Sequence, residues 1–287
     1  MAKKKSRKLA IVMSGGGMRC VYGVGVLTAL IEEYGLIEPD IVIASSGSAG
    51  GAAYYLSGQY RETVSAWLSL LPSKKFISFT RRRMLDVDYV VDEIFKKMHP
   101  FDFKKLAASK TLLIFAATRV KDGKTRYLKV PHDKRIYEYL RATKAIPIVY
   151  GKSVTIGRTE YVDGDFGSDT EDLGRKALSL GARDLIVIES SPLEFLKKEK
   201  RIVMNAVRLI EKLDREPGMA RAAERELVEK PPLVGSAGVR IIRIAPSKNL
   251  HIATSEKNKL KVRTVFNVGY ADARDNKELR ELLTKKS

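Results

Sequence analysis

Cysteine is almost absent from this sequence, with Cys20 the only one among 287 residues. One thiol cannot form an intramolecular disulfide, which excludes a small secreted domain held together by disulfides. The sequence also has only three histidines and no cysteine pair, a composition that disfavours a zinc site. A lone cysteine in such a chain is more often a buried, small apolar residue than a nucleophile.

Long hydrophobic runs are missing as well. No uncharged apolar stretch approaches the roughly 20 residues that a membrane-spanning helix needs. The first apolar run, residues 9–13, is too short for a signal peptide and ends in glycines rather than at a cleavage site. We therefore expect a soluble, cytoplasmic protein.

Acidic residues are outnumbered, since 34 Asp and Glu stand against 53 Lys and Arg, a formal net charge of +19. Such an excess attracts polyanions, and basic residues cluster at 3–8, 81–83 and 197–201. An anionic membrane surface is one candidate partner and would make the protein peripheral to a membrane, but plain solubility explains the charge equally well. No known nucleic-acid-binding module is present, so nucleic acid is not an expected partner.

Two segments near the start share one pattern: a short buried run, a glycine turn and a helix. Residues 9–13 and 41–44 are apolar, and helical spacing follows the turns at 21–31 and 52–56. This repetition predicts an α/β fold with a three-layer, doubly wound, mostly parallel sheet.

The rest of the chain continues this organisation. We expect a basic tail at 1–8 and a single domain over 9–287, with residues 195–230 a charged helical appendage. Further strands are expected at 112–118, 126–130, 154–156, 160–162, 184–189 and 239–244. Further helices are expected at 87–97, 134–142, 173–180, 195–213, 219–228, 256–268 and 276–283.

The first glycine turn consists of Gly15, Gly16, Gly17, Met18 and Arg19. Three consecutive glycines at a helix N-terminus can direct backbone N–H groups at one point and bind a phosphate or an oxyanion there. The residues that follow do not complete a P-loop, and Cys20 stands where a dinucleotide fingerprint needs Gly or Ala. An oxyanion hole and a plain tight turn both remain open.

The second turn has the pattern of a nucleophile elbow with Ser48 as the nucleophile. Such an elbow places a serine on a sharp turn between a strand and a helix, with small residues two positions before and after it. Ser46 and Gly50 occupy those positions, and Gly47 and Gly50 give the turn its room. A helix N-cap provided by Ser48 explains the same residues.

A later loop carries Asp163, which a short hairpin precedes and Gly164 follows. An acidic residue beside glycine is common in turns and is weak evidence by itself. With a serine elbow and a glycine loop, however, it completes the set of groups that acyl transfer needs. The three histidines are not placed like the histidine of a triad, which follows a late strand. They are His99, His132 and His251.

In their order along the chain, these motifs resemble those of the patatin-like phospholipases. The resemblance rests on residues 14–19, on the elbow at 47–50, on Ala-Ile-Pro at 145–147 and on residues 161–164. It extends over roughly residues 8–275, more weakly in the C-terminal third.

This resemblance implies a serine acyl hydrolase that cleaves lipid or other acyl esters, of the phospholipase A or lysophospholipase type, without a cofactor or a metal. It implies a Ser–Asp dyad in which Ser48 forms the acyl-enzyme while Asp163 takes the serine proton and later activates water. The loop at 15–19 would form the oxyanion hole, with backbone N–H groups of Gly16, Gly17 and Met18 as donors, and Arg19 matches the family's basic residue. Because a free aspartate has a pKa of about 3.9, burial or a short bond to the serine must raise it.

Several residues depart from the family pattern. Ser46 replaces the first glycine of the elbow, Cys20 replaces a glycine in the first loop, and Lys144 replaces a small residue. Asp165 and the acidic pair at 171–172 are further departures. They leave a second hypothesis open: a catalytically weak or inactive protein of this fold that acts as a membrane-surface binding or regulatory module.

Overall fold

The computed structural model describes residues 7–80, 84–192, 221–222 and 230–284. Within these ranges an eight-stranded sheet has the order β5-β6-β3-β2-β1-β7-β8, with β4 paired to β3. The strands from β3 to β8 along this path run parallel, whereas β4, β5 and β6 pair antiparallel. The strands are β1 (Lys8–Met13), β2 (Ile41–Ala44), β3 (Leu112–Arg119), β4 (Thr125–Lys129), β5 (Val154–Ile156), β6 (Thr159–Asp163), β7 (Ala182–Ile188) and β8 (Arg240–Ile244).

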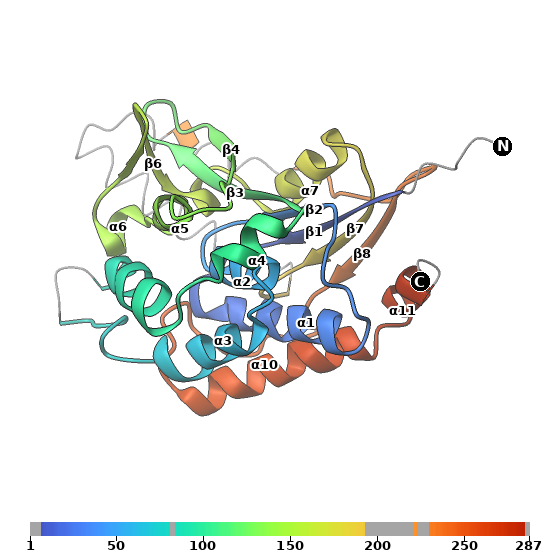
Figure 1. Ribbon diagram of the computed structural model, residues 1–287, viewed down its shortest axis with the longest axis horizontal. Helices are drawn as coiled ribbons and strands as arrows, with labels where there is room; N and C mark the ends of the chain where they lie inside the picture. Colours follow the sequence, from blue (N-terminus) through green and yellow to red (C-terminus); the bar gives the residue numbers. More distant parts are fainter. Residues whose placement is uncertain (1–6, 81–83, 193–220, 223–229, 285–287) are drawn as a thin grey trace.

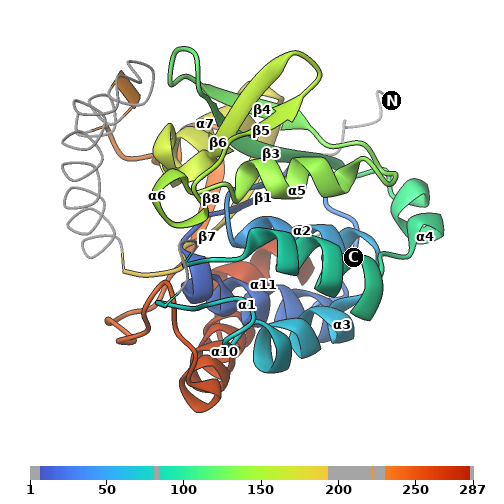
Figure 2. The same cartoon turned by 90° about the vertical axis from the view of Figure 1, so that its left-hand side faces the viewer.

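Helices cover both faces of this sheet. In Figure 1, α1, α2, α3 and α10 lie below the sheet and α7 lies above it, and Figure 2 shows the same layers from the side. The α-helices are α1 (Val21–Glu32), α2 (Ser48–Leu56), α3 (Tyr60–Ser65), α4 (Phe103–Ala108), α5 (Ile136–Thr143), α6 (Pro147–Tyr150), α7 (Thr170–Ser179), α10 (Lys259–Arg274) and α11 (Lys277–Thr284). Two 3₁₀-helices are η1 (Gly17–Cys20) and η4 (Gly164–Phe166). Two π-helices are η2 (Ala66–Leu70) and η3 (Tyr89–Met98).

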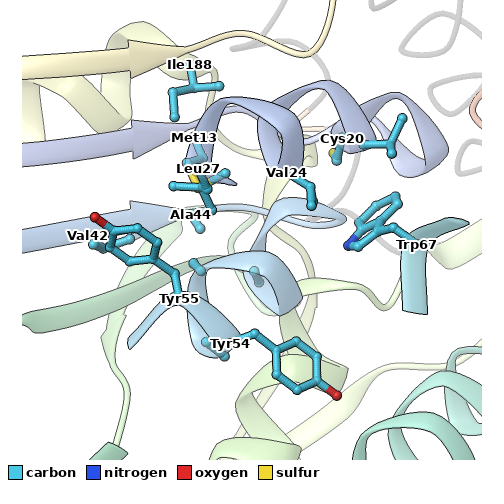
Figure 3. Packing of buried hydrophobic residues seen from close by; sticks show 14 of the residues in the cluster. Met13, Cys20, Val24, Leu27, Val42, Ala44, Tyr54, Tyr55, Trp67 and Ile188 are labelled. Atoms are coloured by element: carbon cyan, nitrogen blue, oxygen red, sulfur yellow. The ribbon is translucent and has the colours of Figure 1, made fainter. Parts of the chain in front are cut away.

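The central strand β1 is buried on both faces because its side chains alternate between two apolar layers. Met13 belongs to the layer shared with α1 and α2, and Val12 belongs to the layer shared with α7. Figure 3 shows Met13 beside Ala44 and Ile188, the last residues of the neighbouring strands β2 and β7. The continuous apolar run read from the sequence follows from this two-sided burial.

The helix α10 packs along α1, below the sheet (Figure 1). The side chain of Asn258 caps its first turn by accepting hydrogen bonds from two backbone N–H groups. The hydroxyl of Tyr22 on α1 donates a 2.7 Å hydrogen bond to Asp272 Oδ2 on α10. Helix α10 thereby fixes the segment before it, which lies against the first glycine turn.

The structure confirms the predicted fold, a mostly parallel sheet flanked by helices, and every predicted strand lies within two residues of its position. The sequence pattern missed α3, α4 and α6 because helices of six or fewer residues span too few turns to show a period. The basic tail at 1–8 and the appendage at 195–230 lie almost wholly outside the described residues. Across the described ranges, no helix has both the length and the apolar composition that crossing a bilayer requires.

Candidate active site

Asp163 lies beside the end of β2 because of how three strands share the two edges of β3. β2 pairs with residues 112–115 of β3, β6 pairs with 117–119, and β4 pairs with 114–118. A strand has only two edges, so β4 occupies one of them, and β6 continues along the other where β2 ends. Asp163 therefore pairs two residues beyond the partner of Ala44, and the chain that leaves β2 runs directly into it.

Ser46 is the residue that meets Asp163. Its Oγ donates a 2.7 Å hydrogen bond to Asp163 Oδ2, and both side chains are buried. Ser46 has a φ of 49°, a left-handed backbone conformation that is uncommon outside glycine and fits the sharp turn of a nucleophile elbow. Its N–H donates to Thr143 Oγ1 at 3.0 Å, and that hydroxyl donates to Ala116 O on β3 at 2.6 Å. Thr143 thus holds the strained turn against the sheet.

Ser48 is placed differently from the sequence-based prediction. It is the first residue of α2, and its Oγ donates a 2.5 Å hydrogen bond to the carbonyl oxygen of Ser14. The predicted contact between Ser48 and Asp163 is not formed, and the structure corrects it to a contact between Ser46 and Asp163. The physical reason is that Gly47 already has helical dihedral angles, so the sharp turn falls one residue before it.

The strand end carries the signal that identifies Ser46 in the sequence. An elbow serine follows its strand closely, and Ser46 comes two residues after Ala44, where β2 ends. Counted from Ser46, the small residues two before and two after are Ala44 and Ser48. The residue that looked like a strained replacement for glycine thus fits the central position of the elbow pattern.

The glycine turn lies against this elbow. Gly16 and Gly17 have φ values of 136° and 58°, conformations that L side chains rarely adopt. A Cβ at Gly47 would lie 2.7 Å from Gly17 O, so the two turns approach as backbone against backbone. The N–H of Met18 donates to Thr254 O at 2.9 Å, and that of Arg19 donates to Gly16 O at 3.2 Å. Gly16 and Gly17 therefore remain the candidate oxyanion donors of this loop.

The loop after β6 completes the site. Asp163 Oδ1 accepts a 2.9 Å hydrogen bond from the N–H of Asp165, and the Asp165 carboxylate lies so close to Gly15 that any Cβ there would overlap it. A Cβ at Gly164 would lie 2.6 Å from the hydroxyl oxygen of Ser45 on the elbow. All three sequence motifs therefore converge. Gly50, one turn into α2, packs instead against the ring of Phe95.

The environment of Asp163 favours a basic carboxylate. Burial raises its pKa well above the ordinary range, and the neighbouring Asp165 carboxylate raises it further. Hydrogen bonds from Ser46 and from the N–H of Asp165, together with the positive charge of Lys144, act in the opposite direction. A carboxylate with a raised pKa can take a proton at neutral pH, as general-base catalysis requires.

Neither cysteine nor histidine contributes to this contact. Burial raises the pKa of the Cys20 thiol to about 12, so it stays protonated and is a poor nucleophile. The hydrogen bonds that join Ser46, Ser48 and Asp163 to their partners within the described ranges involve no histidine. His99 instead lies 3.1 Å from the hydroxyl of Ser65.

An apolar hollow, partly open to solvent, borders Ser46. Gly17, Gly47 and Lys144 border it beside the serine. Its other walls are apolar and come from the segments around η2 and η3 and from the start of η1 and α6; they are Met18, Trp67, Leu71, Phe76, Leu85, Val87, Val90, Phe95 and Ile146. Such a lining suits an aliphatic chain better than a polar ligand.

Comparison with known proteins identifies a family and solved structures that are similar to this chain. The sequence model of the patatin-like phospholipase family, "Patatin-like phospholipase", matches residues 11–170. A search of curated proteins returned no match. The crystal structure of VipD from Legionella pneumophila is similar in fold, with 12% identity and a TM-score of 0.53, covering 97% of this chain and 67% of that one.

A second solved structure is human GIVD cytosolic phospholipase A2 in complex with a methyl gamma-linolenyl fluorophosphonate inhibitor. It is 12% identical, with a TM-score of 0.45, and the match covers 97% of this chain and 58% of that one. The family model spans more than half of the sequence, including the glycine turn, the elbow and Asp163. The chain therefore belongs to the patatin-like phospholipase family, whose chemistry is the hydrolysis of lipid acyl esters.

Proposed function

We propose that this protein hydrolyses lipid acyl esters, of the phospholipase A or lysophospholipase type, with Ser46 as nucleophile and Asp163 as general base. The 2.7 Å hydrogen bond between Ser46 Oγ and Asp163 Oδ2 carries this proposal. Ser46 also has the strained backbone of an elbow serine and borders the apolar hollow.

The proposed steps use the groups of the elbow, the glycine turn and Asp163. Ser46 Oγ attacks the ester carbonyl carbon while its proton passes to Asp163, and the N–H groups of Gly16, Gly17 and Gly47 stabilise the oxyanion. The alcohol leaves with that proton. Asp163 then deprotonates a water molecule that attacks the acyl-enzyme, and the fatty acid is released as Asp163 returns the proton to Ser46 Oγ. One oxyanion donor is typically worth about 2.7–4 kcal/mol of the activation barrier.

The hollow supports an acyl chain as the bound part of the substrate. An alkyl chain gains about 0.8 kcal/mol for each methylene group that it buries against apolar walls. We expect kcat/KM for p-nitrophenyl esters to rise from acetate to hexanoate, because the added methylenes contact residues such as Trp67 and Phe76. A flat chain-length series would contradict acyl binding in this hollow.

Covalent labelling tests the proposed function directly. We expect a fluorophosphonate to add one phosphonyl group to the intact protein, and fragment spectra to place it on Ser46 rather than Ser48. Both serines lie in one tryptic peptide, so the fragments between them decide the assignment. An unlabelled protein that also fails to hydrolyse p-nitrophenyl butyrate would instead support the inactive regulatory module.

The same proposal includes an anionic membrane surface as the partner. Phe79 and Leu260 are large apolar side chains that are 59% and 73% exposed, and Lys257 Nζ lies 5.1 Å from the centre of the Phe79 ring. Phe79 comes three residues after Phe76 in the wall of the hollow. Apolar side chains beside lysines at the entrance fit a surface that inserts rings below anionic headgroups. The basic cluster at 81–83 lies outside the described residues.

Vesicle binding tests this surface. We expect the double substitution F79S/L260S to weaken binding to phosphatidylglycerol vesicles about tenfold or more, measured by sedimentation, because two large side chains no longer enter the bilayer. Salt should weaken the binding of the wild type as well, since lysines contribute. Ile37, 65% exposed just before the start of β2, lies at the opposite end of the strands, and I37S is the control. Equal losses in both variants would refute the assignment of this surface.

A further inference from the structure

Lys144 is a charged side chain within the candidate site that the dyad mechanism leaves without a role. It follows the last residue of α5, and its Nζ donates hydrogen bonds to the carbonyl oxygens of Ser46 and of Gly47, the latter at 3.1 Å. It also borders the hollow beside the serine. An ammonium group thus bonds to the backbone of the elbow itself.

The charged groups around Lys144 indicate what its positive charge does in the site. Asp163 ends β6 and Asp165 lies two residues later in η4, and two carboxylates this close disfavour each other's ionisation. The groups that interact electrostatically with Lys144 are these two carboxylates and the Cys20 thiol, which Arg19 in turn influences. In the described part of the site, Lys144 supplies the positive charge that favours ionised Asp163.

We propose that Lys144 is a positioning residue of this active site: its ammonium group fixes the two carbonyls of the elbow and serves as the counter-ion that keeps Asp163 ionised. This inference rests on the proposed function and adds a residue to it. The ammonium group does not contact the reacting atoms; it acts through the backbone of the nucleophile and through the charge of the base.

The burial of Lys144 gives the proposal a pH dependence. Burial lowers its pKa to about 8, so the positive charge is lost as the pH rises through that value. We therefore expect hydrolysis by the wild type to decline above about pH 8. The decline should be absent from K144M, which has no charge to lose, and should move to higher pH in K144R, because arginine stays protonated.

Steady-state kinetics on p-nitrophenyl butyrate, a soluble ester, tests the proposal across pH 5–10. We expect K144M to lose about 10- to 100-fold in kcat/KM at pH 7. The acidic limb of its kcat/KM–pH profile should move to higher pH, because Asp163 has lost its counter-ion. K144R should keep the acidic limb of the wild type. A K144M profile that runs parallel to that of the wild type at every pH would show a merely structural role and overturn the proposal.

A second measurement separates this inference from the proposed function, because it needs no catalysis. In the unfolded chain a lysine titrates near its ordinary pKa of 10.5, above the folded value of about 8. Between these values the unfolded state binds more protons, so the free energy of unfolding gains a contribution that rises with pH. The midpoint temperature of thermal unfolding of S46A should therefore rise from pH 8 to 10 relative to that of S46A/K144M. If the two variants show the same dependence of thermal stability on pH, the inference about the buried charge of Lys144 is overturned, whether or not the wild type hydrolyses esters. If the two dependences differ but the wild type is inactive, only the proposed function is overturned.

Discussion

Substitution of Ser46 by alanine should abolish ester hydrolysis, with a fall in kcat of at least ~10⁴-fold, because the acyl-enzyme cannot form without the hydroxyl. Ser46 is the side chain that donates to Asp163, and no other group of the described elbow replaces that hydrogen bond. The measurement is kcat on p-nitrophenyl butyrate, with fluorophosphonate labelling of the same preparation. S46A should fold, since alanine removes one oxygen atom from the turn.

Ser48→Ala is the matched control, because the two serines lie two residues apart and only one contacts Asp163. S48A should keep hydrolysis within about tenfold of the wild type and still take the fluorophosphonate. The free energy of unfolding of S48A should be lower by about 1–3 kcal/mol, because Ser14 O loses a buried hydrogen bond. The reverse pattern, an inactive S48A and an active S46A, would return the nucleophile to Ser48.

Substitution of Asp163 by asparagine should lower kcat by about 10³- to 10⁴-fold, because the side chain keeps its shape but can no longer accept a proton. Asparagine can still accept the hydrogen bond from the N–H of Asp165 and can donate to Ser46 Oγ, so the local structure should persist. The measurements are the rate of phosphonylation by the fluorophosphonate and steady-state hydrolysis. Activity within tenfold of the wild type would exclude Asp163 as the base.

The raised pKa of Asp163 also fixes the direction of two pH effects. In the wild type, kcat/KM should fall on acidification through a pKa above 3.8, as the base becomes protonated. A carboxyl group whose folded pKa exceeds its unfolded value favours folding below the unfolded value, and that contribution is lost as the pH rises through the folded value. D163N removes this penalty, so at neutral pH it should be inactive yet at least as stable to heat as the wild type. A D163N variant with lower thermal stability than the wild type would show that the buried carboxylate does not destabilise the folded state.

The departures that suggested a degenerate protein acquire physical explanations in the structure. Ser46 stands in the strained turn as the partner of Asp163, and Lys144 donates to the carbonyls of that turn. Asp165 uses its N–H to orient the Asp163 carboxylate. These three residues form one connected arrangement, as a working site with its own electrostatic balance would.

The sequence by itself determined the sheet and the turns of this protein. Continuous apolar runs such as residues 9–13 have one stable place, between two helical layers, and glycines after them mark where the chain reverses. The glycine turn, the elbow and the loop with Asp163 could therefore be located from local pattern alone. The spacing of small residues fits both serines of this elbow, and by itself it favours Ser48, which Gly50 follows at the required distance.

Tertiary structure alone decided which serine meets the carboxylate. That choice depends on β6 taking the edge of β3 where β2 ends, which follows from strand pairings between residues 42 to 71 positions apart along the chain. It also depends on Gly47 being already helical, which puts the sharp turn at Ser46 and the hydroxyl of Ser48 against Ser14 O. Register between distant strands is set by the packing of the whole sheet, so no short stretch of sequence contains it.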